Sequence, residues 1–236
     1  MKADMKRFLT EAFEAPAPKQ KNEFLKRMER PHISIFSFML QQVLYIRKRV
    51  WLISLLASVF AFLSIGYVGA DSLWIISALL PFVALCAVTE NTRSAVYGMA
   101  ELEMTSRFSL KSITLARLSV IGVLHFLIFC MLVLLTGKST ALPIFRASIY
   151  LLVPYLLTSV LSLTAARKIH GKEVLYACTG ISILVSSLNF VVKEMLPNVY
   201  GEKQFVWWCV LVIYLLVRML NEYKRTIYQT EELVWN

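Results

Sequence analysis

Six long apolar runs dominate this chain of 236 residues and constrain what it can fold into. Hydrophobic residues make up 58% of the chain and charged residues only 17%, where a soluble domain carries about a quarter charged residues. The runs have close to the roughly 17–25 residues that cross a bilayer, and such continuous runs indicate helices, because a helix satisfies its backbone groups internally. The sequence therefore predicts an all-α integral membrane protein with six transmembrane helices, at Val50–Val68, Leu73–Thr89, Leu118–Thr136, Pro143–Thr164, Val174–Val192 and Phe205–Leu220.

The basic residues between these runs are distributed unevenly, which predicts the orientation of the chain. Of the 25 Lys and Arg residues, 21 fall in the leader, in the loops after the second and fourth runs, and in the tail. The alternate loops hold the other four, Lys138, Arg146, Lys193 and Lys203. Loops rich in Lys and Arg stay in the cytoplasm, so both termini are expected there. This gives a cytoplasmic leader over residues 1–49, a transmembrane body over 50–220 and a cytoplasmic tail over 221–236. The net charge of +10 is then mainly a topology signal, with membrane lipids as partners and no nucleic acid.

The run Gly137-Lys138-Ser139-Thr140 matches the end of a phosphate-binding P-loop. A P-loop needs a glycine five positions before Gly137, and that position is Leu132. The predicted topology also puts Lys138 in a short outer loop. The segment is therefore interpreted as a turn, and no nucleotide hydrolysis is expected from it.

Other catalytic or metal-binding patterns are not evident in the sequence. The three histidines, His32, His125 and His170, fall in the leader, in the middle of the third run and in an inner loop. The four cysteines lie inside apolar runs without a CxxC pair, as buried small hydrophobic residues do. No catalytic residue, no metal site and no cofactor on this chain are predicted.

The leader divides into two parts. Residues 1–30 are charged, and the sequence after Pro31 reads SIFSFMLQQVLYIRKRVW, apolar with two glutamines and a following basic cluster. This pattern predicts an amphipathic helix in the inner membrane interface that leads into the first span at Trp51. The alternative is that the segment lengthens the first span.

The inner loop after the second span, at about residues 90–112, is the most informative stretch. It is longer than the usual connection of about four to six residues. Its middle contains good helix formers with Glu101 and Glu103, and Phe108 stands between Arg107 and Ser109. An apolar anchor with a polar rim is typical of a docking site. A solvated loop whose Phe108 dips into the membrane interface fits the residues equally well.

This loop resembles the coupling region of ABC-2 type transporter permeases. In that family a short glutamate-containing helix leads into an apolar-Ser element and a third span with Lys or Arg at its start, as Glu101 or Glu103, Thr105 and RFSLKSITLARL do here. The family's frequent Glu-x-Gly-Thr is Glu103-Met104-Thr105 in this chain, without the glycine. The predicted interfacial helix and the six predicted spans with both termini in the cytoplasm also match this family.

The resemblance implies the function of the chain and its partners. It implies a multi-pass subunit of an exporter in a bacterial cell membrane, paired with a second copy or a related permease. ATP and Mg would be bound by a separate cytoplasmic ATP-binding cassette subunit. The docking residues that it implies are Glu101, Glu103, Thr105, Arg107, Phe108 and Ser109.

Two features inside the spans are candidates for a translocation path. Thr179, Ser182, Ser186 and Asn189 fall within an arc of roughly 80° on the fifth span. Such a polar stripe faces another helix or water, so it lines a path or joins two helices. His125 in the third span is either a path residue or a neutral histidine bonded to a neighbouring helix.

Three functions remain open from the sequence. The first is the permease subunit described above. The second is a membrane enzyme, which the missing catalytic motifs disfavour. The third is a membrane sensor or scaffold that does not transport and whose inner loop docks a cytoplasmic partner. The sequence does not identify a substrate.

Overall fold

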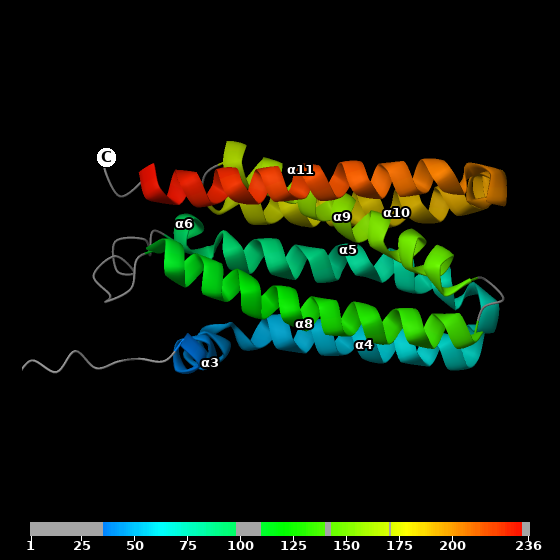
Figure 1. The fold of residues 1–236 in the computed structure, drawn as a ribbon, viewed down its shortest axis with the longest axis horizontal. Coiled ribbons are helices and arrows are strands. Elements are labelled where there is room, and N and C mark those ends of the chain that lie inside the picture. The colour runs from blue at the N-terminus through cyan, green and yellow to red at the C-terminus, as the bar shows by residue number, and fades with distance from the viewer. Residues whose placement is uncertain (1–34, 98–109, 140–142, 170, 233–236) are drawn as a thin grey trace, which may run out of the picture. The chain divides into compact units, whose positions relative to one another are not determined.

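The computed structural model describes residues 35–97, 110–139, 143–169 and 171–232 (Figure 1). The chain divides into two units, Met1–Ser37 and Phe38–Asn236. Within the described residues every regular element is a helix. Six of these helices are long and apolar enough to cross a membrane: α4 (Lys48–Val68), α5 (Ser72–Asn91), α8 (Leu110–Ser139), α9 (Ile144–Lys168), α10 (Glu173–Met195) and α11 (Phe205–Glu232).

These six helices match the six predicted spans, and the two longest extend beyond them. Helix α8 begins at Leu110 rather than at Leu118, and α11 continues to Glu232 rather than ending at Leu220. Hydropathy marks only the part of a helix that lies in hydrocarbon, whereas backbone hydrogen bonds continue into polar sequence. At 1.5 Å per residue, the 30 residues of α8 cover roughly 45 Å, more than the roughly 30 Å of a bilayer core.

Short elements connect the long helices. Helix α3 (Ile35–Tyr45) is separate from α4 and is seen nearly end-on in Figure 1, where α4 runs across the view. A 3₁₀ turn, η1 (Gly69–Asp71), joins α4 to α5. Helix α6 (Arg93–Val96) follows α5, and η2 (Pro197–Tyr200) and η3 (Glu202–Gln204) lie between α10 and α11.

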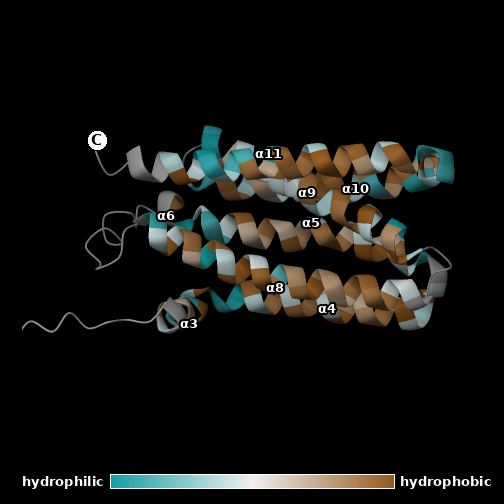
Figure 2. Cartoon of the chain, in the orientation of Figure 1, coloured by the Kyte–Doolittle hydropathy of each residue, from teal (hydrophilic) through white to brown (hydrophobic). Residues whose placement is uncertain are grey.

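Helices α5 and α9 form the centre of the bundle. In an apolar stretch of 18 residues, 56% of the residues are buried in α5 and 61% in α9. In the other four long helices the buried share is 11–22%. Leu73, Ile76 and Leu80 of α5 pack with Tyr150 and Leu151 of α9 in the main core. The outer helices expose large apolar side chains, and Figure 2 shows hydrophobic residues along α8 and α11. Hydrocarbon is the solvent that suits such a surface.

A proline inside α9 explains one contact between α5 and α9. Pro154 lacks an N–H group, so the carbonyl of Tyr150, four residues earlier, loses its usual partner in the helix. The hydroxyl of Ser77 on α5 donates a hydrogen bond to this carbonyl at 3.3 Å. Side chains of neighbouring helices commonly satisfy carbonyls that a proline frees in a membrane span. Helix α9 therefore continues through Pro154.

The same serine connects α5 to α10. The Asn189 amide donates to the Ser77 hydroxyl at 2.7 Å, and the Ser186 hydroxyl donates to the Ala78 carbonyl at 2.8 Å. The Tyr200 hydroxyl donates to Asn189 Oδ1 at 3.3 Å. Burial raises the pKa of Tyr200 to about 12, so this hydroxyl keeps its proton at neutral pH. These side chains form a polar network across three elements.

An aromatic cluster closes the bundle at the end where α4 meets α5 and α10 meets α11. Tyr200 makes an edge contact with Trp74 at 4.4 Å between ring centroids and stacks on Trp208 at 5.1 Å. Trp208 Nε1 donates to the Val199 carbonyl at 2.8 Å, and the Tyr150 hydroxyl donates to the Tyr200 carbonyl at 2.9 Å. We call this end the aromatic end. The opposite end, where Arg93, Arg117 and Arg167 lie, is called the basic end.

Replacing Asn189 by leucine is expected to loosen α10. The Asn189→Leu variant loses the hydrogen bonds to Ser77 and Tyr200, and interhelical hydrogen bonds in membranes contribute about 1–2 kcal/mol. We expect a loss of that size in the free energy of unfolding, measured by circular dichroism as SDS is added to the protein in detergent micelles. Ser187→Ala is the matched control, because the Ser187 hydroxyl bonds within α10. A control variant that loses as much as Asn189→Leu would contradict the role of the network.

Candidate functional site

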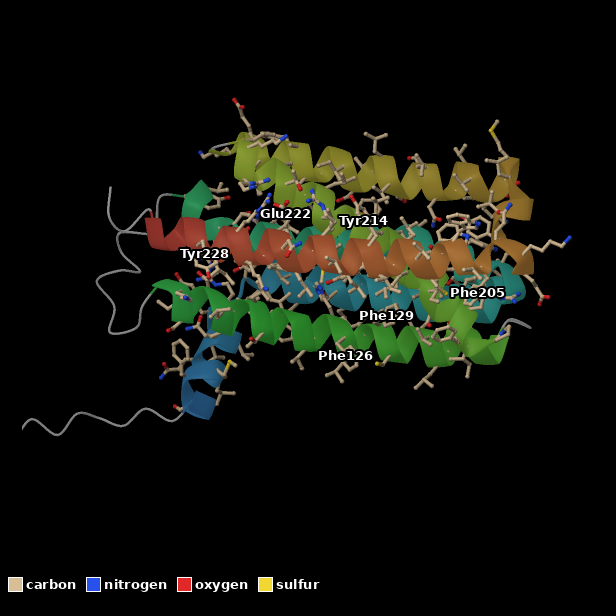
Figure 3. All side chains as sticks on the ribbon, turned by 45° about the horizontal axis from the view of Figure 1, so that its top comes forward. Phe126, Phe129, Phe205, Tyr214, Glu222 and Tyr228 are labelled. Carbon is tan, nitrogen blue, oxygen red and sulfur yellow. The ribbon has the colours of Figure 1, made fainter. Side chains whose placement is uncertain are left out.

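An apolar cavity of about 270 Å³ lies among α5, α8, α9 and α11. The α5 side chains that line it recur at helical spacing, at Leu80, Val83, Ala87 and Asn91, so they form one stripe. The α8 wall runs from Leu118 to Phe129, and it includes Gly122 and His125 as well as Phe126 and Phe129, which Figure 3 labels. Tyr155 comes from α9, and Leu216, Met219 and Tyr223 come from α11.

Besides two tyrosines, Tyr155 and Tyr223, two polar side chains, His125 and Asn91, interrupt this apolar lining. His125 is buried, and its Nδ1 lies 3.2 Å from the Tyr155 hydroxyl, while its Nε2 is buried without a hydrogen-bond partner. Both side-chain amide atoms of Asn91 are likewise buried without a partner. A buried polar atom without a partner is uncommon and costs free energy. Each of these atoms thus has hydrogen-bonding capacity that its described neighbours leave unused. Since no Asp, Glu, Lys or Arg lines the cavity, it suits an uncharged molecule.

A buried carboxylate lies at the basic end of the bundle. Glu222 of α11 has a side chain only 1% exposed, and Figure 3 labels it. Arg167 Nε of α9 lies 3.4 Å from one oxygen of this carboxylate, and Arg218 and Arg225 of α11 each place a nitrogen 3.7 Å from the other. A buried charge persists when opposite charges surround it. The three arginines compensate Glu222, and Arg167 joins the end of α9 to α11.

A second charged cluster joins α3 to the bundle at the same end. The Tyr45 ring lies under two guanidinium groups, Arg93 at 4.9 Å and Arg117 at 5.3 Å from the ring centroid. Arg93 also forms an ion pair of 3.2 Å with Glu90, which is buried. Cation–π contacts of this kind strengthen when they are shielded from water. They hold the end of α3 against α6 and α8.

The structure separates the residues that the sequence predicted as a path. Thr179 and Ser182 donate to carbonyls within α10, whereas Ser186 and Asn189 contact α5. No α10 residue lines the cavity, so the stripe on α10 and His125 do not form one site. For Ser186 and Asn189 the contacts favour helix packing. His125 has the expected polar neighbour on another helix and also lines the cavity.

The predicted docking residues lie outside the part of the chain that the structure describes. These are Glu101, Glu103, Thr105, Arg107, Phe108 and Ser109.

Sequence reasoning missed Asn91, Tyr155 and Glu222. Glu222 stands among Arg218, Lys224 and Arg225, at the start of the segment predicted as a cytoplasmic tail. A single acid among basic residues at the end of a span is the signal that could have suggested a buried ion pair. Asn91 and Tyr155 give no such signal, because their importance depends on which helices meet.

Comparison with known proteins gives no relative: no family model, no curated protein and no solved structure matches this chain. Within the described residues, no three His, Cys, Asp or Glu side chains are grouped so that they could hold a metal ion. The fold has the six apolar helices of an α-helical, multi-pass membrane protein.

Removing the charge of Glu222 is expected to destabilise the basic end. In Glu222→Gln, Arg167 loses its counter-charge while its side chain is only 25% exposed. Breaking a buried pair costs about 3–5 kcal/mol, and partial exposure of the arginines reduces this to about 2–3 kcal/mol in unfolding free energy. The control is Glu202→Gln, because Glu202 is 84% exposed in its pair with Arg146 and should change stability by less than about 1 kcal/mol. Equal effects of the two substitutions in SDS unfolding would contradict the account.

Proposed function

We propose that this chain is the transmembrane permease subunit of an ATP-driven exporter of the ABC-2 type. It would lie in a bacterial cell membrane, paired with a second copy or a related permease. ATP and Mg would be bound by a separate cytoplasmic ATP-binding cassette subunit. The resemblance of residues 90–112 to the coupling region of that family and the six apolar helices support this proposal.

The observation that carries the proposal is the continuity of α8. This helix begins at Leu110, directly after the proposed docking residues, and continues without interruption past His125 in the cavity wall. The distance from Leu110 to His125 along the helix is roughly 22 Å at 1.5 Å per residue. A displacement of the docking segment would thus move the wall of the cavity, because a helix transmits motion along its axis as a rigid element.

ATP would supply the energy for this movement through its partner. A ligand shifts a conformational equilibrium only by its differential affinity for the two states. If ATP favours a closed pair of ATP-binding subunits, closure would push on residues 101–109 and tilt α8. The cavity and the path between two permeases would then change their access from one side of the membrane to the other.

The orientation of the chain is part of the proposal. The Lys and Arg distribution supports a cytoplasmic position for both termini and for the loop at 98–109. The basic end would then face inward and the aromatic end outward. Helix α3 would lie in the inner interface, since it exposes Leu40 and Leu44, which are 55% and 83% accessible.

Substitution of the docking residues is expected to release the ATP-binding subunit. The tagged full-length chain would be purified in mild detergent from the membranes of its native host, and co-purifying proteins identified by mass spectrometry. We expect a protein with a P-loop that hydrolyses ATP. Glu101→Ala combined with Phe108→Ala should reduce its recovery about thirtyfold, because loss of a central anchor costs about 2 kcal/mol.

The matched control replaces an acid and an aromatic residue at the aromatic end. Glu202 and Phe145 are 84% and 67% exposed, so Glu202→Ala with Phe145→Ala should leave the recovery unchanged. Recovery of a partner without a P-loop would favour the sensor or scaffold function. Undiminished recovery with the docking variant would show that the docking residues are misassigned.

A further inference from the structure

We propose that the cavity among α5, α8, α9 and α11 binds one uncharged, elongated apolar molecule with a hydroxyl-like group that pairs with Nε2 of His125. Binding itself does not depend on an ATP-driven partner. The further step, that such molecules are the class of compound exported, rests on the proposed function.

The lining of the cavity determines the charge of the ligand. Its residues are apolar apart from Asn91, His125 and the two tyrosines, Tyr155 and Tyr223. An ionised group in such surroundings would lose its hydration without gaining a counter-charge. Charged residues next to the lining in sequence are already paired: Glu222 has its three arginines and Glu90 has Arg93. An uncharged ligand is therefore favoured.

The size and shape of the cavity favour an elongated molecule. Its volume of about 270 Å³ is almost twice that of an engineered cavity of about 150 Å³ that holds benzene. The α5 stripe runs from Leu80 to Asn91 and the α8 wall from Leu118 to Phe129. Each stretch covers roughly 16 Å along its helix at 1.5 Å per residue. A hydrocarbon chain fits this space better than a compact ring system.

The unsatisfied nitrogen of His125 determines the polar group. If the Tyr155 hydroxyl donates to Nδ1, the proton of the neutral imidazole is on Nε2, which then donates to the ligand. If Nδ1 donates to Tyr155, Nε2 accepts. A hydroxyl can accept or donate, so it pairs with either tautomer. An ether or an amine would match only one role, and the amine would also carry a charge.

The α8 wall offers an entry from the bilayer. Phe126 lines the cavity while 65% of its surface is exposed, so the cavity extends to the outer face of α8. Gly122, one turn earlier, also lines the cavity, and a Cβ added there would meet no atom within 4 Å. The missing side chain at Gly122 leaves this part of the wall open. Both a bilayer lipid and an apolar compound dissolved in the membrane would enter the cavity through this part of the wall.

The test uses photolabelling of the purified full-length chain. The chain is placed in nanodiscs of phosphatidylethanolamine and phosphatidylglycerol, without any partner subunit or ATP. The probe is hexadecanol with a diazirine in its chain, and labelled peptides are identified by mass spectrometry. We expect saturable labelling of residues 118–129, displaced by unlabelled hexadecanol and not by hexadecylamine or hexadecyl sulfate.

Two variants separate specific binding from contact with lipid. Gly122→Phe should fill the opening and reduce saturable labelling at least tenfold, whereas Gly180→Phe should leave it unchanged. Gly180 is the matched control because it also lies in a long helix, is exposed and has open space at its Cβ, but does not line the cavity. His125→Leu should weaken binding of the alcohol about tenfold and leave a diazirine-labelled hexadecane unaffected, since one neutral hydrogen bond is lost.

Two results would overturn the inference. One is equal labelling of α8 in the wild type, Gly122→Phe and Gly180→Phe, each shown to be folded by its elution volume and thermal unfolding. The other is displacement by the charged competitors as effective as that by hexadecanol. If Gly122→Phe does not fold, Gly122→Leu and His125→Leu give the same comparison.

Separate measurements test the source of the ligand and the proposed function. Mass spectrometry of the chain freshly extracted from its host identifies a resident bilayer lipid if one occupies the cavity, and a chain that arrives empty indicates a membrane-dissolved compound as the ligand. Saturable labelling, together with a co-purification that recovers no ATP-hydrolysing partner, would support this inference and contradict the proposed function. Recovery of a coupled ATPase without saturable labelling would support the proposed function and contradict this inference.

Discussion

The absence of hydrogen-bonding partners in hydrocarbon is the constraint on which this structure depends. The six long helices satisfy their backbone groups internally. Many of their hydroxyls follow the same rule, and those of Thr136 and Thr158 donate to carbonyls of their own helices. At Pro154 of α9, which lacks an N–H group, α5 supplies the donor, because Ser77 donates to the freed carbonyl of Tyr150. Through Ser77 this repair also connects α5 to Asn189 of α10, so local chain chemistry determines which helices meet.

The same constraint separates charged from apolar sites along the bundle. Glu222 and Glu90 lie near helix ends at the basic end, each with arginine beside it. The cavity farther along the helices has no charged lining residue, and its polar atoms are the unpartnered nitrogen of His125 and the amide of Asn91. A helix that begins next to the proposed docking residues forms one wall of this cavity. Under the proposed function, this arrangement would link the docking residues to an apolar site within the membrane.

Much of the fold could be predicted from the sequence, because hydropathy depends on the residues of one segment alone. All six spans were predicted, with the main differences at Leu110 and Glu232, where helices continue into polar sequence that hydropathy does not mark. His125 stood out because an ionisable residue in a long apolar run is rare. The cavity around it could not be predicted, since Asn91, Tyr155 and Gly122 acquire their roles only when four helices meet. The stripe on α10 was recognised, but only the structure shows that Ser186 and Asn189 face α5.

The orientation of the basic end is the claim on which the proposed coupling depends, and labelling of single cysteines tests it most directly. The four native cysteines would be replaced, and Tyr97→Cys, Lys172→Cys and Lys203→Cys introduced one at a time, all at exposed positions. The account predicts that a membrane-impermeant maleimide labels Lys203→Cys in intact cells and the other two only after permeabilisation. Labelling of Tyr97→Cys and Lys172→Cys from outside, with Lys203→Cys protected, would contradict it.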